Sequence, residues 1–476
     1  MRATAVALAA LVVLAGCVSH GGIEPVAQRI DPAALGLDEA AAAPFDWPRD
    51  DWWRGYGDAR LDLLIGRALD GNPSLAVAAA RLARARSFAE AAAAADQPRV
   101  NASADSTYQR YTENGLVPPP LAGSRRTSNS LLLNAGWELD FFGRYQAALD
   151  AALGQARAAQ ADLQAARQLL ASQVARIYFQ LAHALEQRSL AQATLRQREQ
   201  LLELVRARVA AGLDTRVELR QAEGALPETR QRIEQLDEQI ALARNALAAF
   251  TVQPAAALAD LAPGLPARAT VVVPTSIPAD LLGRRADVAA ARWRIEAALR
   301  ERDAAKAEFY PNVNLAAFAG LSSLGFSRLL DSGSAVYGFG PALRLPVFDA
   351  GRLRAGLRGK TAEIDAAMES YNAAVAEAVH DVADQLASLR SVDRQAVEQR
   401  AAQQAAESAF ELSVQRYRAG LGNYLSVLVA ESAVIAQRRN AAELKARGIE
   451  LDVALIHALG GGYVEAAAAR DERAHK

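Results

Sequence analysis

The sequence predicts a mainly helical protein with a small β part, and three patterns in its 476 residues carry that prediction. A seven-residue apolar repeat runs through residues 144–210. Short segments elsewhere alternate apolar and polar side chains. The whole arrangement then occurs a second time further along the chain. Each half is therefore predicted to fold as a helix, two strands, a long helix, a turn and a return helix.

The long helix is predicted from the spacing of its apolar residues. One row recurs every seven positions, at Leu149, Ala156, Leu163, Leu170, Ile177 and Ala184. A repeat of this kind is typical of helices that supercoil around their neighbours. At about 1.5 Å per residue the helix would be roughly 100 Å long, which is deeper than any globular core. The helix is therefore predicted to belong to a long bundle, rod or tube.

The composition excludes several classes of protein. Hydrophobic residues make up 51% of the chain but aromatic residues only 6%, as expected where small side chains let helices pack closely. The net charge is −1, and basic residues form no stripe of the kind that nucleic-acid binding requires. No partner nucleic acid is therefore predicted. Five scattered histidines show no metal-ligand spacing, so no metal or other cofactor is predicted.

The first residues have the pattern of a secretion signal. A short basic start and an apolar stretch over Ala3–Ala15 precede Gly16-Cys17, and Cys17 is the only cysteine of the chain. The stretch is too short for a comfortable membrane span. It resembles a bacterial lipoprotein signal over 1–16, after which Cys17 would carry diacylglycerol and an N-acyl chain. The alternative is an ordinary secretory signal with a chance cysteine.

The domain boundaries follow from changes in periodicity. After an extended N-terminal segment over 17–57, the first repeat is predicted over 58–250, with strands near 99–109 and 130–140 and a long helical hairpin over 144–250. A proline-rich linker occupies 251–279. The second repeat is predicted over 280–459, with strands near 312–320 and 336–347, a hairpin over 352–459 and a tail over 460–476.

Matching motifs identify the duplication. Gly143-Arg144 recurs as Gly351-Arg352, 208 positions later. Ala211-Gly212-Leu213 recurs as Ala419-Gly420-Leu421 at the same offset. A coincidence could produce one such match but not the ordered set, so the two halves are interpreted as copies of one duplicated structural unit.

Four strands per chain, with one apolar and one polar face, cannot remain an open sheet without exposing edges and a large apolar surface. Closure with copies of the same chain removes both, and lipid can cover the outside. Two copies would fill the interior with side chains, whereas three copies, with twelve strands, leave room for water. The polar residues predicted to line the barrel lumen are Asn101, Ser103, Asp105, Asn312 and Asn314.

Several motifs together resemble those of the TolC-like outer-membrane efflux proteins, in particular their NodT-type lipoprotein branch. They are Trp137-Glu138-Leu139-Asp140-Phe141-Phe142-Gly143-Arg144, Pro346-Val347-Phe348-Asp349-Ala350-Gly351-Arg352, Arg285-Ala286-Asp287-Val288, Phe309-Tyr310-Pro311-Asn312-Val313 and Ala458-Leu459-Gly460-Gly461-Gly462-Tyr463. The resemblance implies a homotrimer with a twelve-stranded outer-membrane barrel that continues into a periplasmic coiled-coil barrel. It implies two protein partners, a periplasmic adaptor and an inner-membrane transporter, and contact with outer-membrane lipid.

The resemblance also implies roles for the hairpin tips. The positions that match the adaptor-contacting residues of the family are Arg208, Gly212, Leu213, Arg416, Gly420 and Leu421. Many members carry a ring of aspartates after the second tip glycine, but this sequence has Ser426 and Val429 there. Closure of the periplasmic gate is instead predicted to use Tyr417, Tyr424 and packing of Leu425 or Leu428 across the trimer axis.

The chain is predicted to be a passive, gated exit duct for drugs or other small molecules, located in the outer membrane. The sequence contains no phosphate-binding glycine loop, no nucleophile-elbow serine and no catalytic cysteine, so no enzyme activity is predicted. Two alternatives stay open: a channel for protein secretion, and a coiled-coil lipoprotein that only tethers the layers of the envelope. The alternating strands argue against the tether, which needs no lipid-facing sheet.

Overall fold

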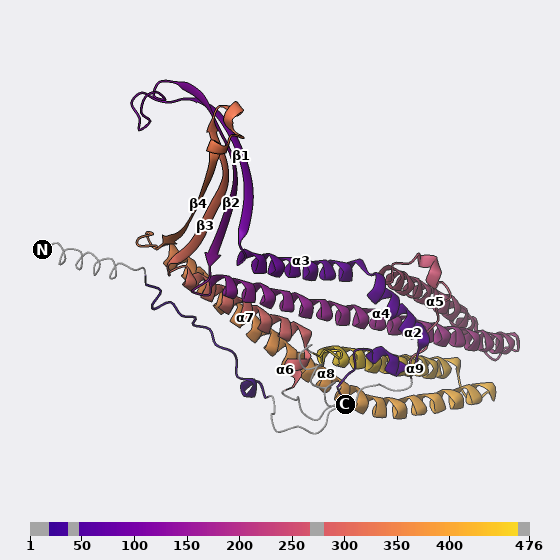
Figure 1. The fold of residues 1–476 in the computed structure, drawn as a ribbon. Helices are drawn as coiled ribbons and strands as arrows, with labels where there is room; N and C mark the ends of the chain where they lie inside the picture. Colours follow the sequence, from indigo (N-terminus) through magenta and orange to yellow (C-terminus); the bar gives the residue numbers. More distant parts are fainter. Residues whose placement is uncertain (1–18, 37–46, 267–279, 465–476) are drawn as a thin grey trace. The chain divides into compact units, whose positions relative to one another are not determined.

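The structure is a computed structural model that describes residues 19–36, 47–266 and 280–464. The predicted signal peptide, Cys17, half of the predicted linker and most of the C-terminal tail lie outside the described residues. Figure 1 shows the described chain as long helices joined to one antiparallel sheet.

The elements follow one another in the same order in both halves. The first half contains α2 (Ala59–Gly71), α3 (Pro73–Ala95), β1 (Arg99–Arg110), β2 (Arg125–Leu139), α4 (Arg144–Ala210) and α5 (Arg216–Phe250). The second half contains α6 (Leu281–Arg284), α7 (Ala286–Ala307), β3 (Asn312–Leu324), β4 (Ala335–Arg344), α8 (Arg352–Arg418) and α9 (Tyr424–Ala458). Helices α4 and α8 are each 67 residues long, and α5 and α9 are each 35.

The sheet has the strand order β1-β2-β3-β4, and all of its pairings are antiparallel. Strand β2 begins five residues earlier than the sequence indicated, and β3 extends to Leu324. Strand β4 ends at Arg344, short of the predicted end at 347, because Arg344 pairs with Asn312, the first residue of β3, and the residues beyond it have no partner in that strand. Gly320 faces β2 so closely that a Cβ there would lie 2.0 Å from the carbonyl oxygen of Leu131.

The described residues form two compact units, and each unit takes chain from both repeats. The first consists of residues 19–29, 81–159 and 291–371 and contains the whole sheet. Its buried apolar cluster consists of Ile23, Phe309, Leu353 and Leu357. Within it α4 and α7 approach closely, since a Cβ at Gly154 would lie 3.1 Å from the Ala297 side chain.

The second unit consists of residues 30–36, 47–80, 160–266, 280–290 and 372–464 and contains both hairpin tips. Its largest apolar cluster joins α2, α4, α5 and α9, and its fully buried members include Leu61, Ile65, Val174, Tyr178, Leu181, Leu247 and Val453. A separate cluster fills the tips. Among the described helices, none combines the length and the apolar composition needed to cross a membrane.

The glycines that follow α9 stop the helix and also admit neighbouring backbone. Gly460, Gly461 and Gly462 all have positive φ angles. A Cβ at Gly460 would lie 2.0 Å from the Arg284 carbonyl oxygen, and one at Gly462 would lie 2.2 Å from the backbone near Asp50. These close contacts need residues without a Cβ, and they depend on the tertiary structure rather than on the local sequence.

Candidate functional site

Both helical hairpins reverse through the same turn. Gly212 and Gly420 have φ angles of 70° and 76°, which L side chains rarely adopt. After each glycine a backbone N–H returns to the last helical turn, from Leu213 to Arg208 O at 2.9 Å and from Leu421 to Arg416 O at 2.8 Å. These are the hydrogen bonds of a glycine-terminated helix end. The sequence therefore determines both reversals locally.

Polar caps begin the two return helices. The Thr215 side chain accepts a hydrogen bond from the backbone of α5 and forms a reciprocal capping box with Glu218. At the equivalent position of the second repeat, Asn423 Oδ1 accepts from the Ser426 N–H at 3.0 Å. The caps supply acceptors for backbone N–H groups that the first turn of each return helix would otherwise leave without a partner.

Three side chains connect the two tips, and we call them the tip clasp: Arg208, Asp214 and Tyr417. Arg208 donates to Asp214 from Nε at 2.9 Å and from Nη2 at 3.2 Å. Its Nη1 donates to the Tyr417 carbonyl oxygen at 3.1 Å, and its guanidinium lies 4.4 Å from the centre of the Tyr417 ring. The Tyr417 hydroxyl donates to Asp214 Oδ2. The clasp therefore joins the α4–α5 hairpin to the α8–α9 hairpin within one subunit.

The clasp is mostly buried, and its charges compensate one another. The exposed fraction of the side chain is 12% for Arg208 and 9% for Asp214. Burial raises the pKa of Asp214, but hydrogen bonds from Arg208 and Tyr417 outweigh it and hold the pKa below its ordinary value. The hydrogen bond to Asp214 raises the pKa of Arg208, and burial followed by the same carboxylate raises the pKa of Tyr417. Asp214 is therefore ionised at neutral pH.

The clasp is not duplicated, although the tips are. The repeat offset places Gly422 where the first tip has Asp214, and Val209 where the second has Tyr417. Arg416, the equivalent of Arg208, is exposed, and among the described residues its side chain donates a hydrogen bond only to the Leu421 carbonyl oxygen, at 3.4 Å. One hairpin thus supplies the ion pair and the other supplies the tyrosine.

The structure separates the predicted tip and gate residues into buried and exposed groups. The exposed ones are Gly212, Leu213, Arg416, Gly420, Leu421 and Leu425. Tyr417 and Tyr424 are buried inside their own subunit with ring centres 5.7 Å apart, and Leu428 packs partly buried beside them. Burial raises the pKa of Tyr424 to about 12, with Glu431 as the next cause. Packing of these side chains across a trimer axis stays a prediction.

The register places the predicted lumen residues on one face of the sheet. Asn101 lies opposite Asn134, Asp105 lies opposite Ser130, and Asn314 lies opposite Glu138. Asn134 donates to Ser103 Oγ at 3.3 Å, and Asn312 donates to Glu138 Oε1. Side chains of alternating residues occupy the reverse face, which is apolar and carries Leu131, Leu133, Trp137, Leu315, Tyr337 and Phe339.

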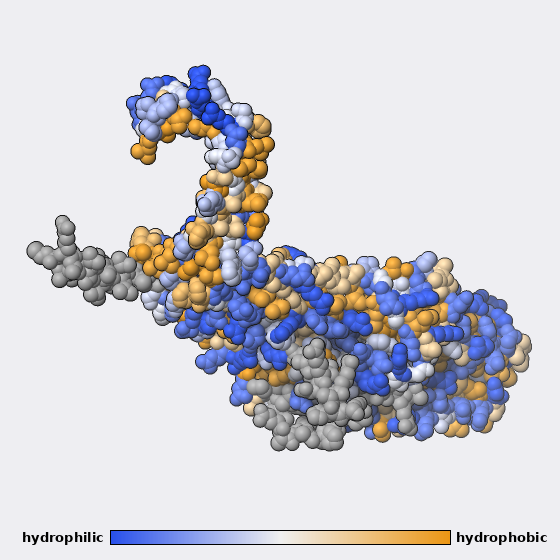
Figure 2. Space-filling model, in the orientation of Figure 1, coloured by the Kyte–Doolittle hydropathy of each residue, from blue (hydrophilic) through white to orange (hydrophobic). Residues whose placement is uncertain are grey.

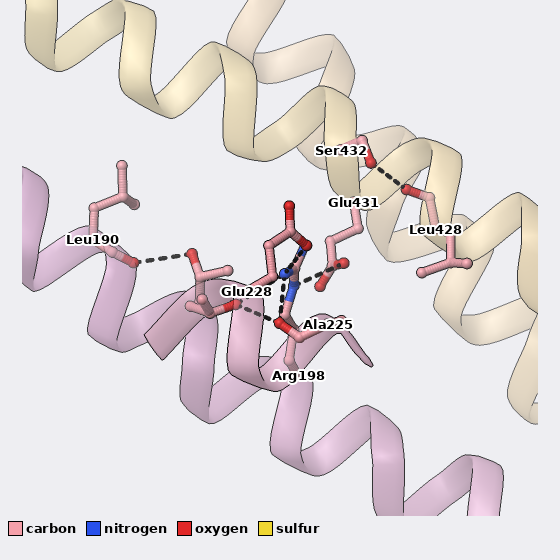
Figure 3. Close-up of polar contacts among 9 residues, drawn as sticks. Leu190, Arg198, Ala225, Glu228, Leu428, Glu431 and Ser432 are labelled. Carbon is pink, nitrogen blue, oxygen red and sulfur yellow. Dashed lines mark hydrogen bonds and ion pairs between the residues drawn. The ribbon is translucent and has the colours of Figure 1, made fainter. Parts of the chain in front are cut away.

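A buried ion pair links the same two hairpins further from the tips (Figure 3). Glu431 of α9 is 1% exposed, and its Oε2 lies 3.3 Å from Arg198 Nε of α4. Arg198 also donates from Nη1 to the Ala225 carbonyl oxygen and to Thr229 Oγ1, both at 2.9 Å. Glu431 Oε1 has no hydrogen-bond partner among the described residues. Burial raises the pKa of Glu431 despite the opposing effect of Arg198.

Substitution of Glu431 and substitution of Arg198 should therefore change the free energy of unfolding by unequal amounts. Glu431→Gln removes a poorly solvated charge, so the free energy of unfolding at pH 7 should change by less than about 1 kcal/mol, whereas Arg198→Met leaves that charge buried alone and should cost about 3–5 kcal/mol. Because the folded pKa of Glu431 lies above its unfolded value of 4.5, wild-type stability should fall as pH rises through the folded pKa. The glutamine variant should lack this slope. Unfolding of the purified protein in detergent at several pH values measures the stability of each variant and its pH dependence. Equal losses of stability in the two variants would contradict the unequal roles assigned to Glu431 and Arg198.

The residues that follow the predicted lipid anchor are held against the first unit. Arg354 donates to the carbonyl oxygens of Ser19 and Gly21, the latter at 3.4 Å. The His20 ring lies 5.9 Å from the Phe309 ring in an edge-on contact. Ile23 is buried beside Phe309. Contact with the rest of this unit therefore begins at Ser19, two positions after Cys17 in the sequence.

Sequence reasoning missed Asp214 and Arg198 as partners in the site. Asp214 lies two residues after the tip glycine Gly212, where a polar residue is ordinary turn chemistry, and Arg198 lies within a long charged helix. The only signal was the difference between repeats, where Asp214 is replaced by Gly422. Such a break in an internal repeat marks a residue that the shared turn does not require.

Comparison with known proteins connects this geometry to a family of transport proteins. A family model described as outer membrane efflux protein matches residues 64–251 and 277–461, so one segment falls in each repeat. The multidrug resistance outer membrane protein MdtQ of Escherichia coli O6:H1 is 32% identical over 462 residues, which is 95% of this chain and 96% of MdtQ. The fusaric acid resistance protein FusA of Burkholderia cepacia is 36% identical over 364 residues, covering 75% of this chain and 69% of FusA.

A solved structure shows the same fold. The outer membrane protein VceC of Vibrio cholerae superposes with a TM-score of 0.81 at 36% sequence identity, covering 87% of this chain and 100% of VceC. The outer-membrane channel OprN gives a TM-score of 0.81 at 27% identity, covering 94% of this chain and 98% of OprN. The mainly helical architecture with a small antiparallel sheet predicted from the sequence is thereby confirmed.

Proposed function

This chain belongs to the outer membrane efflux protein family, and on that premise we propose that it forms the exit duct of a tripartite efflux pump. An inner-membrane transporter supplies the energy and a periplasmic adaptor joins the two. The duct itself is passive and catalyses no reaction. Its cargo is drugs or other small molecules, in keeping with the names of MdtQ and FusA.

The observation that carries this proposal is the open sheet with one polar and one apolar face. Strands β1 and β4 are its edges, and they run in opposite directions because every pairing between them is antiparallel. The β4 edge of one subunit can therefore pair with the β1 edge of the next in the same antiparallel manner. Three subunits give a closed barrel of twelve strands, with lipid outside and water inside.

The exposed leucines at the two tips support a docking role for this end. Leu213 and Leu421 project from equivalent turns and are 64% and 71% exposed. Apolar side chains presented in pairs on a polar helical surface favour contact with another protein. We assign Gly212, Gly420 and Arg416 to the same adaptor surface. Arg208 belongs instead to the tip clasp, which we assign to closing the duct.

Lipid on Cys17 would hold the subunit to the inner leaflet of the outer membrane. The contacts of Arg354 with Ser19 and Gly21, and of His20 with Phe309, support this, because they hold residues 19–21 within the unit that contains the sheet. We expect metabolic labelling with palmitate to mark the wild type and to be lost in Cys17→Ser. Label retained in that variant would contradict acylation at this residue.

Deletion of the gene in its own host tests the proposed function. We expect the deletion strain to accumulate several chemically unrelated fluorescent dyes, and complementation with the full chain to restore their export. A protein-secretion channel would leave dye accumulation unchanged while a secreted protein stayed inside the cell. A structural tether would change neither, and its loss would appear only as altered spacing of the envelope layers.

A further inference from the structure

Two arginines lie side by side at the end of the sheet that is joined by the 111–124 loop. The register places Arg110, the last residue of β1, directly opposite Arg125, the first residue of β2. Both are exposed. Figure 2 shows hydrophilic colour gathered at this end of the sheet. The pair is thus a compact positive site at the rim.

The pair lies on the apolar face. Directly opposite residues share a face, and the face alternates along each strand. The pairs Ala104–Leu131 and Ala102–Leu133 therefore occupy the same face as Arg110–Arg125. The neighbouring pair, Gln109 and Arg126, lies on the polar face.

The positive charge of the pair is only partly compensated within the chain. Arg110 donates from Nη2 to Glu113 Oε1 at 2.8 Å and from Nε to the Gly123 carbonyl oxygen at 3.4 Å. Across the described residues Arg125 has no ion pair. Like charges directly opposite each other destabilise a strand pair. Two guanidinium groups against one carboxylate therefore leave a positive charge that an anion from outside the chain can balance.

The position along the strands indicates which anion this is. A cation on the lipid-facing side of a barrel costs about 2–4 kcal/mol at the middle of the bilayer and about 0–1 kcal/mol near its surfaces. Two adjacent arginines on this face therefore fit the headgroup layer, beyond the apolar band that includes Leu131 and Leu133. The guanidinium group is planar and carries several donors, which suits bidentate contact with a phosphate group.

We propose that Arg110 and Arg125 bind a phosphate group on the headgroup of an outer-leaflet glycolipid. The proposal rests on the proposed function, because that function makes the apolar face the outer surface of a barrel and puts the loop end on the cell exterior. It adds a specific lipid contact at one rim of each subunit.

The full-length trimer in mild detergent, titrated with bis-phosphorylated lipid A and followed by native mass spectrometry, tests the site. We compare the wild type with the double variant Arg110→Gln/Arg125→Gln and with Arg126→Gln, which removes a neighbouring arginine from the opposite face. The dissociation constant should rise about tenfold or more in the double variant, since each lost charge-assisted hydrogen bond is worth about one such factor. It should not change in Arg126→Gln.

Further measurements separate the sources of binding. Dephosphorylated lipid A should bind all three proteins equally, and millimolar inorganic phosphate should not displace lipid A from the wild type. The proposal fails if the double variant binds lipid A as tightly as the wild type. It also fails if Arg126→Gln lowers the affinity for lipid A as much as the double variant does, or if free phosphate displaces the lipid. Conductance of the same preparations in planar bilayers keeps the proposed function separate. If the channels conduct but the wild type binds phosphorylated and dephosphorylated lipid A equally, the lipid site alone is contradicted. If the wild type never conducts, the proposed channel function is contradicted.

Discussion

Arg208→Gln should raise the resting conductance of the reconstituted channel, and Arg416→Gln should leave it unchanged. Arg208 makes two hydrogen bonds to Asp214 and one to Tyr417, and so holds one hairpin to the other. A hydrogen bond to a charged group contributes about 1.5–3 kcal/mol. Its loss should shift the balance between closed and open tips by about tenfold or more in each subunit. Single-channel recording in planar bilayers measures the change.

Arg416 is a matched control because it is the same residue type at the equivalent position of the other repeat. It is exposed, and its hydrogen bond to the Leu421 carbonyl oxygen stays within its own hairpin. Equal effects of the two substitutions would show that charge at the tips, rather than the clasp, controls conductance. Tyr417→Ala and Tyr424→Ala extend the test, and unchanged conductance in both would remove these rings from the gate.

The clasp should also be insensitive to pH over the ordinary range. The folded pKa of Asp214 lies below its ordinary value of 3.8, so its stabilising contribution is present above that value and is lost only as pH falls through the lower folded pKa. The difference in conductance between Arg208→Gln and the wild type should therefore be the same at pH 5 and pH 8.

Leu133→Arg should prevent assembly of the trimer in the outer membrane, whereas Leu132→Arg should be tolerated. Leu133 lies on the apolar face and is 56% exposed in the single subunit. An arginine facing lipid near the bilayer centre costs about 2–4 kcal/mol, and the trimer would carry three. The amount of heat-resistant trimer in outer-membrane fractions measures the loss.

Leu132 provides the control, since it is the next residue on the same strand but shares its face with Asn134 and Ser103. An arginine there would enter the water-filled lumen. We expect normal trimer levels and a shift of ion selectivity toward anions, which reversal potentials in a salt gradient would measure. Loss of trimer in Leu132→Arg and survival of Leu133→Arg would mean that the faces are assigned the wrong way round.

Local signals were sufficient for much of the fold. The glycines at 212 and 420 require left-handed backbone, so both hairpin turns were visible from the chain alone. The alternation of apolar and polar residues located each strand in the sequence, because the side-chain period of two is a property of the strand itself. Strand ends were less accurate. The first five residues of β2 are all polar, and their place in the strand depends on pairing with β1 and β3.

The candidate site was only half visible. The position of Tyr417 near the tip predicts a role in the gate, but its partners Arg208 and Asp214 come from a hairpin about 200 residues away. No spacing rule relates residues so distant in sequence. The burial of Glu431 beside Arg198 was hidden for the same reason, because charged residues on a long helix are ordinarily solvated.

The sequence by itself determined the duplication, the long coiled-coil helices, the helix-reversing glycines and the two faces of the sheet. The duplication follows from motifs that recur at a fixed offset, and the other features follow from the spacing of residues within a single element. Only the tertiary structure decided that the two repeats meet through one asymmetric clasp, that a buried ion pair joins α4 to α9, and that two arginines stand together at the rim. Those features depend on which elements pack against each other, and that choice is made by contacts between residues far apart in the chain.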